Sequence, residues 1–134
     1  MRILVAEDDA VSRRVLEAVL ERMGHECAVT ADGNEAWARL ADGEGAPEVL
    51  ITDWMMPGLA GPDLCRRVRE RYGESVYVVM LTALSGEAHV RAAMDAGADD
   101  FLTKPLDRNQ LQMRLAVAER LHALRARVHE LEAR

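Results

Sequence analysis

Short apolar runs alternate along the chain with longer amphipathic stretches. The runs are aliphatic, rich in β-branched residues and nearly unbroken, and they occupy residues 3–6, 27–29, 49–51, 76–81 and 101–102. Unbroken runs of this length are typical of parallel strands that are covered on both faces. Two of the intervening stretches carry apolar residues at helical spacing. These residues are Val11, Val15, Val19 and Met23 in the first, and Leu64, Val68 and Tyr72 in the second. The alternation predicts an α/β fold, a doubly wound parallel sheet of five strands with about five helices.

Glycines and helix-capping residues mark the ends of the predicted helices. A glycine ends each of four helical stretches, at Gly24, Gly43, Gly73 and Gly97, because a left-handed residue stops a helix at low cost. Gly61-Pro62-Asp63 is typical of a helix start, with proline in the first turn and an acid near the positive end of the helix dipole. Asp107, followed by Gln110, resembles a capping box that opens the last helix.

The last helix is unusually long. From Asp107 no glycine or proline interrupts the chain before Arg134, so the helix is predicted to run about 27 residues, or roughly 40 Å. Its early residues Leu111 and Leu115 are expected to pack on the sheet. Five later residues follow the four-three spacing of a coiled-coil seam, namely Val117, Leu121, Leu124, Val128 and Leu131.

This seam covers just over two heptads, so two interpretations stay open. The end of the helix is either a solvated tail, or a stalk that joins two copies in a homodimer or links the domain to an output domain beyond Arg134. We divide the chain into a domain of residues 1–120 and a C-terminal helical extension of residues 121–134.

Composition narrows the class of protein. The 134 residues are 49% hydrophobic and 30% charged, a mixture typical of one globular domain. A net charge of −6 argues against direct nucleic-acid binding. Cys27 and Cys65 lack the spacing of a zinc or redox motif, and no apolar run reaches the ~18 residues of a membrane span. The acidic start is unlike a signal peptide, so we expect a cytoplasmic domain with no membrane partner.

Polar side chains follow four of the five apolar runs. They are Glu7-Asp8-Asp9, Thr52-Asp53, Thr82-Ala83 and Thr103-Lys104-Pro105. In an open parallel sheet, ligands bind beyond the carboxyl ends of the strands. The second run ends without an obvious chemical group, as expected for an edge strand. The sequence therefore predicts a carboxylate cluster, a hydroxyl and an ammonium at one edge of the sheet.

The chemistry of this cluster requires a cation. Several neighbouring carboxylates cannot all stay ionised without positive charge, and Lys104 supplies only one. Mg²⁺ is the natural completion, because it prefers carboxylates, waters and phosphate oxygens. A metal and a lysine beside an aspartate favour phosphoryl transfer through an acyl phosphate. Asp53 stands alone and suits the nucleophile, Glu7 and Asp8 suit the metal, and Asp9 suits a helix cap.

Four segments together resemble the CheY-like receiver (REC) domain of two-component response regulators. They are residues 3–9, residues 53–58 with Gly61, residues 81–83 and residues 97–105, and the resemblance extends from residue 2 to about residue 120. It implies the flavodoxin-like sheet with strand order 2-1-3-4-5.

The resemblance also implies roles for the acidic residues. Asp53 matches the phosphoacceptor. Glu7 and Asp8 match the acidic pair that holds Mg²⁺, or Mn²⁺ as a substitute, together with Asp53 and the backbone carbonyl of Met55. Glu7 replaces the more frequent aspartate of the family.

Further residues match the phosphoryl-binding and switch positions. Thr82 and Ala83 correspond to the phosphoryl-binding end of the fourth strand, and Lys104 corresponds to the lysine that pairs with a phosphoryl oxygen. Phe101 corresponds to the rotating aromatic residue of the switch. The Lys104-Pro105 bond matches the cis peptide of the family, which only a proline tolerates.

The function implied is that of a phosphorelay receiver. A sensor histidine kinase or a phosphotransfer protein, docking on the helix near Ala10, donates its phosphoryl group to Asp53, and Thr82 and Phe101 then change partner binding or output. The domain is a phosphoacceptor switch rather than an enzyme, with only Mg-dependent self-phosphorylation and slow autodephosphorylation. Met55 and Leu84 are apolar and cannot orient an attacking water, so we expect hydrolysis to be slow for a receiver.

Two other functions fit less well. An aspartate-nucleophile phosphatase usually needs a second aspartate two residues after the nucleophile, where this chain has Met55. A nucleotide or flavin binder needs a phosphate loop rich in glycine and hydroxyl residues after the first strand. The acidic residues 7–9 at that position repel phosphate unless a metal intervenes.

Overall fold

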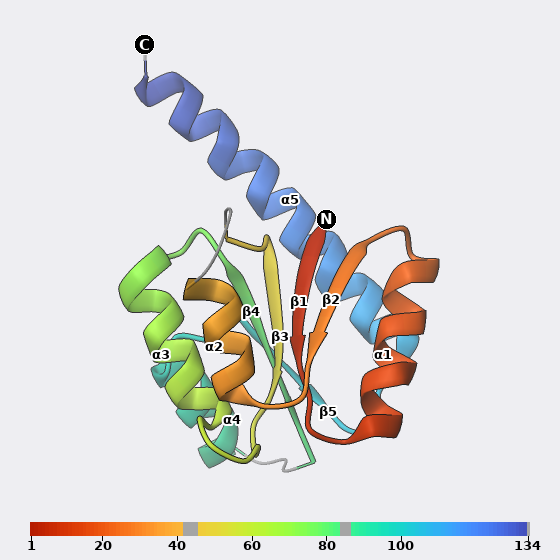
Figure 1. Ribbon diagram of the computed structural model, residues 1–134. Coiled ribbons are helices and arrows are strands. Elements are labelled where there is room, and N and C mark those ends of the chain that lie inside the picture. Colours follow the sequence, from red (N-terminus) through yellow and green to blue (C-terminus); the bar gives the residue numbers. More distant parts are fainter. Residues whose placement is uncertain (42–45, 84–86, 134) are drawn as a thin grey trace.

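The computed structural model (Figure 1) describes residues 1–41, 46–83 and 87–133. Strands and helices alternate along the chain. In order they are β1 (Arg2–Ala6), α1 (Ala10–Arg22), β2 (Glu26–Thr30), α2 (Gly33–Ala41), β3 (Val49–Asp53), α3 (Gly61–Tyr72), β4 (Tyr77–Thr82), α4 (Glu87–Asp95), β5 (Asp100–Thr103) and α5 (Arg108–Glu132). The strands form one sheet of order β2-β1-β3-β4-β5, and every neighbouring pair is parallel. The predicted fold and strand order are confirmed.

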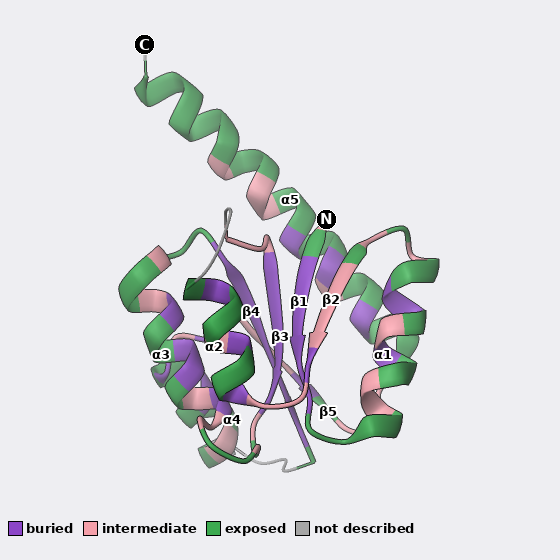
Figure 2. Ribbon diagram, viewed as in Figure 1, coloured by how far each residue is buried: buried purple, intermediate pink, exposed green. Residues whose placement is uncertain are grey.

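Helices cover both faces of the sheet (Figures 1 and 2). Alternate residues of β1 point to opposite faces, so Ile3 and Val5 pack toward α1 and α5 while Leu4 and Ala6 pack toward α2, α3 and α4. Strands β3 and β4 are buried along their whole length because they lie in the middle of the sheet. Strand β2 is only half-buried, as expected for the edge strand that it is.

The predicted helix ends agree with the structure where it describes them. Gly24, Gly73 and Gly97 have positive φ angles of 88°, 61° and 104°, and Gly43 lies outside the described residues. Helix α3 begins at Gly61, with Pro62 in its first turn.

Two aspartates cap helices as the sequence predicts. Asp9 accepts a hydrogen bond from the amide of Ser12 at the start of α1. Asp107 accepts hydrogen bonds from the amides of Asn109 and Gln110 at the start of α5. Each side chain satisfies amide groups that have no partner within the helix.

The inner face of α1 differs from the apolar row seen in the sequence. Val11 and Val15 are 70% and 50% exposed, whereas the buried residues are Leu16, Val19 and Leu20. A row of residues spaced by four drifts about 40° around the helix at each step. The row that begins at Val11 therefore starts on the solvent side and reaches the core only at Val19.

Helix α5 is one continuous helix of 25 residues, close to the predicted length. Leu111, Leu115 and Ala118 are buried against the sheet. The rest of α5 extends beyond the amino ends of the strands (Figure 1). The helix crosses the predicted boundary at residue 120 without a break, so that boundary stays a prediction. Among the described helices, none has the length and apolar character needed to cross a membrane.

Candidate phosphoacceptor and metal site

Parallel strands bring polar residues from distant parts of the sequence to one edge of the sheet. Glu7 follows β1, Asp53 ends β3 and Thr82 ends β4. Lys104 follows β5, and its amide donates a hydrogen bond of 2.7 Å to the carbonyl of Thr82. The register pairs Asp53 with Leu81, one residue before Thr82. These side chains therefore meet at the carboxyl ends of the strands.

The loop after β3 closes tightly on Asp53. The amide of Gly61 donates a hydrogen bond of 3.0 Å to the carbonyl of Trp54. A Cβ atom at position 61 would lie 2.3 Å from the Asp53 carbonyl and 2.8 Å from Met80 Sδ. Only glycine fits there, which explains its place in this part of the sequence.

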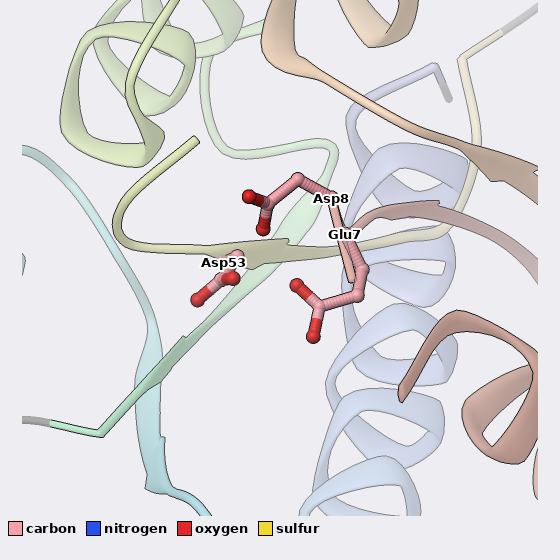
Figure 3. A group of neighbouring side chains, drawn as sticks. All are labelled: Glu7, Asp8 and Asp53. Carbon is pink, nitrogen blue, oxygen red and sulfur yellow. The ribbon is translucent and has the colours of Figure 1, made fainter. Parts of the chain in front are cut away.

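Three carboxylates converge beside one ammonium. Glu7, Asp8 and Asp53 each offer an oxygen, and these oxygens lie within 4.8 Å of one another. Figure 3 shows the three side chains as neighbours. Glu7 and Asp53 are 1% and 7% exposed, whereas Asp8 is open to solvent. Lys104 Nζ donates hydrogen bonds to Glu7 Oε1 at 2.7 Å and to Asp53 Oδ2 at 3.0 Å. Asp53 Oδ1 accepts a further bond of 3.0 Å from the Trp54 amide.

The electrostatics of the cluster reflect a shortage of positive charge. Burial, followed by the neighbouring Glu7 carboxylate, raises the pKa of Asp53 to about 6, although Lys104 acts in the opposite direction. Burial by itself would lower the pKa of Lys104, but its hydrogen bonds to Glu7 and Asp53 outweigh burial and raise it. One ammonium therefore does not balance the carboxylates.

The donor atoms suit a hard divalent cation. Glu7 Oε2 is buried and has no hydrogen-bond partner among the described residues. An oxygen-only set of carboxylates is what Mg²⁺ prefers in proteins. In the described ranges, no second group of three or more acidic, histidine or cysteine side chains meets the same distance criterion. Glu7, Asp8 and Asp53 could therefore hold such a cation.

The other predicted site residues lie around this cluster. Thr82 is buried, Ala83 is exposed, and Phe101 is half-buried against the core beneath α2, α3 and α4. The Lys104-Pro105 peptide bond is cis. Met55 lies two residues after Asp53 with its side chain 69% exposed; its carbonyl remains a predicted ligand. Leu84 lies outside the described residues.

Sequence reasoning missed Arg13. Its guanidinium donates hydrogen bonds to the carbonyls of Glu7 at 2.9 Å and Asp8 at 3.4 Å. It thereby fixes the loop from which both acidic side chains project. The only signal in the sequence is a basic residue one turn into the helix that follows the acidic loop.

Comparison with known sequences places this chain among signalling proteins. Residues 3–116 match the response regulator receiver domain family. The chemotaxis protein CheY1 of Helicobacter pylori is 38% identical over 120 residues, which cover 87% of this chain and 95% of that protein. The phosphate regulon transcriptional regulatory protein PhoB of Pseudomonas aeruginosa is 34% identical over 114 residues, which cover 84% of this chain and 49% of that protein.

Solved structures of response regulators have the same fold as this chain. A putative response regulator from Chloroflexus aurantiacus has a TM-score of 0.80 and 33% identity, and covers 87% of this chain and 95% of its own. The chemotaxis protein CheY4 of Vibrio cholerae has a TM-score of 0.80 and 26% identity, and covers 87% of this chain and 97% of its own. Sequence and structure together assign this chain to the response regulator receiver domain family.

Proposed function

We propose that Asp53 accepts a phosphoryl group from a sensor histidine kinase or a phosphotransfer protein, and that the chain acts as a phosphorylation-driven switch. Receiver domains are phosphoacceptor switches rather than enzymes that turn over a separate substrate. The observation that supports this function best is the buried Asp53 carboxylate, gathered with Glu7 and Asp8 beside the single ammonium of Lys104. Such a surplus of negative charge is suited to binding a cation and, through it, a phosphoryl group.

The side chains fit an in-line displacement. A carboxylate oxygen of Asp53 attacks the phosphorus, the new P–O bond forms, and the bond to the donor's nitrogen or oxygen breaks with its electron pair leaving on the donor. Lys104 pairs with one phosphoryl oxygen, and the Thr82 hydroxyl and the Ala83 amide bind another. Mg²⁺ or Mn²⁺, held by Glu7, Asp8, Asp53 and the Met55 carbonyl, would neutralise charge on the phosphoryl oxygens.

The switch follows from the new charge on Asp53. Lys104 now contacts Glu7 and Asp53, and a phosphoryl group would compete for this ammonium. Thr82 and Phe101 would move inward, and the surface formed by α4, β5 and α5 would change. This is a population shift between two packings that differ by a few kcal/mol.

The donor's docking surface is proposed to be the apolar groove beside α1. A groove of about 310 Å³ lies between α1 and the segment after β5, lined in part by Val11, Val15 and Leu106, with Glu7 and Lys104 also on its wall. The two valines are exposed, so a partner's apolar side chains could pack there within reach of Asp53.

A mass measurement tests the phosphoacceptor. We expect incubation with Mg²⁺ and a small acyl phosphate to add one alkali-labile phosphate, and Asp53→Asn to abolish the addition. Asp9→Asn is the matched control, since Asp9 is an exposed cap, and it should retain the addition. Lys104→Ala should slow it. A phosphate that persists in Asp53→Asn would place the acceptor elsewhere.

A kinetic comparison tests the docking surface. Val15→Lys should slow transfer from a phosphorylated histidine kinase while leaving acceptance from the small acyl phosphate unchanged. Val90→Lys, at an exposed valine of α4, is the control and should alter neither rate. Equal kinase transfer to wild type and Val15→Lys would rule out this groove.

We also propose that the chain acts in the cytoplasm. Cys27 and Cys65 are free thiols, which agrees with a reducing cytoplasm. PhoB of Pseudomonas aeruginosa matches over about half its length, so an output domain encoded beyond Arg134 would fit the same pattern. The open reading frame that contains this chain tests that point directly.

A further inference from the structure

Helix α5 carries an apolar stripe on a face that points away from the domain. Val117, Leu124, Val128 and Leu131 are each about half exposed or more. They lie roughly 80–140° around the helix from Ala118, which is buried against the sheet. The stripe is therefore separate from the face that packs on the core, and within the described chain nothing buries it.

Contacts with the body of the domain fix the direction in which α5 projects. Leu121 packs partly against the core. His122 Nε2 donates a hydrogen bond of 2.6 Å to the Glu48 carbonyl, and Arg125 donates to the Glu74 carbonyl and pairs with its carboxylate at 3.8 Å. Residues 126–133 are exposed throughout (Figure 2). Helix α5 thus projects as an anchored rod.

We propose that a second copy of this chain covers the stripe, as a parallel two-stranded coiled coil over residues 117–131. This inference does not rest on the phosphoacceptor function. Spacing puts Leu121 and Val128 at the a positions of the heptad, and Val117, Leu124 and Leu131 at the d positions. Beyond the body the seam has β-branched Val128 at a and leucine at d, a combination that favours two strands.

Charges beside the seam favour the parallel direction. The g positions hold Arg120 and Arg127, and the e positions hold Arg125 and Glu132. In a parallel pair Arg127 faces Glu132 of the partner subunit, twice by symmetry. An antiparallel pair would instead bring the arginine flanks of both helices together. The remaining like-charged pair, Arg120 with Arg125 of the partner subunit, is relieved because Arg125 already contacts Glu74.

The proposed dimer interface lies far from the acidic site. The rod leaves from the amino ends of the strands, whereas Asp53 lies at their carboxyl ends (Figures 1 and 3). Two copies joined through the stripe keep both acidic pockets and both α1 grooves open. We therefore expect the dimer to form without phosphorylation, and Asp53→Asn to leave it unchanged.

Sedimentation of the full chain over a concentration series tests the association. We expect a reversible monomer–dimer equilibrium, which Leu124→Lys weakens by at least about ten-fold. Ala126→Lys adds the same charge at the neighbouring f position on the outer side of the helix and should leave the equilibrium unchanged. Circular dichroism checks that both variants are folded. A chain that stays monomeric, or a dimer that Leu124→Lys does not weaken, would overturn the proposal.

Cross-linking tests the direction. Under mild oxidation, Leu131→Cys should form a disulfide between two copies in a parallel pair, because d positions face each other. Wild type, whose thiols at Cys27 and Cys65 are half-buried and buried, is the control. A dimer in which Leu131→Cys does not cross-link would contradict the parallel arrangement, even if the stripe forms the interface.

Discussion

The pocket around Asp53 and the cluster around Arg69 both hold acids and bases at hydrogen-bond distance, but they differ in how fully the groups are paired. Arg69 donates to four acceptors, which are Gly73 O, Val76 O, Gly97 O and Asp99 Oδ2. Asp99 Oδ2 also accepts from the Val78 amide at 2.8 Å. In the Asp53 pocket three carboxylates lie close together, but the one ammonium contacts only Glu7 and Asp53, and Glu7 Oε2 has no partner in the described chain.

This difference in pairing distinguishes a cluster that stabilises the fold from one that is suited to binding a ligand. The Arg69 cluster joins α3, β4 and the turn before β5, and pairing is complete enough to stabilise the fold without a further ligand. The Asp53 pocket keeps a surplus of buried negative charge that the fold itself does not need. An unbalanced buried cluster is therefore a stronger candidate for a binding site than a large number of charged residues.

The largest effect should come from breaking the paired cluster. Arg69→Ala removes one guanidinium and leaves Asp99 and three carbonyls without it, so we expect the free energy of unfolding to fall by about 2–4 kcal/mol. Arg66→Ala is the matched control on the same helix, because its ion pair with Asp63 is exposed, and should change stability by less than about 0.5 kcal/mol. Urea denaturation measures both. Equal losses of unfolding free energy in the two variants would show that the Arg69 cluster stabilises the fold no more than an exposed ion pair does.

Removing charge from the unbalanced cluster should act in the opposite direction. Because the pKa of Asp53 is raised to about 6, the folded state binds its proton more tightly than the unfolded state does. Wild type should therefore gain stability as pH falls from 7 through 6. Without metal at pH 7, Asp53→Asn should be more stable than wild type by about 1–3 kcal/mol.

The pH dependence of the stability difference between Asp53→Asn and wild type tests this explanation. Urea denaturation in the presence of a chelator should show the advantage of Asp53→Asn shrinking as pH falls below 6, since wild type then carries the proton itself. Asp9→Asn, which changes an exposed cap, should track wild type from pH 5 to pH 8, because the hydrogen bond from the Ser12 amide lowers the pKa of Asp9 and keeps it ionised over that range. An advantage for Asp53→Asn that stays constant from pH 5 to pH 8 would contradict the charge-surplus explanation.

A divalent cation should balance the same surplus. We expect Mg²⁺ at ten times its dissociation constant to raise the unfolding free energy of wild type by about 1.4 kcal/mol. Asp8→Asn removes one carboxylate and should need more Mg²⁺ for the same rise in melting temperature. KCl at matched ionic strength controls for screening. Identical Mg²⁺ titrations of wild type and Asp8→Asn would remove Asp8 from the metal site.

The smallest effect concerns the lifetime of the phosphoryl group. Met55 is exposed beside the pocket and has no group that can orient water. Met55→Asn supplies such a group, so we expect phosphate release to accelerate a few-fold, equivalent to less than about 1 kcal/mol. Release of inorganic phosphate from the phosphorylated protein measures this rate. Equal rates in wild type and variant would remove the role assigned to Met55.

The site was predictable from the sequence because strand ends obey a simple rule. Lys104 and Glu7 are 97 positions apart, yet both follow apolar runs, and parallel strands bring such positions together. Caps such as Asp9 were predictable for a similar reason, since they depend on only a few neighbouring residues.

Contacts that depend on the exact placement of helices were not predictable. The spacing that begins at Val11 does not reveal which side of α1 faces the sheet. Arg69 lies in a stretch with several arginines, and nothing local distinguishes it from Arg66 or Arg71. The contact of His122 with Glu48 joins residues 74 positions apart and requires the position of α5 across the sheet.

The length of α5 has a mechanical consequence. The helix begins four residues after Lys104 and runs without glycine or proline to Glu132, a distance of about 37 Å. A tilt of about 5° at its first turn would displace its far end by about 3 Å if the helix stays straight. A small change in orientation beside Lys104 would thereby become a displacement of several ångströms at the far end of α5, large enough to alter contacts with a neighbouring protein.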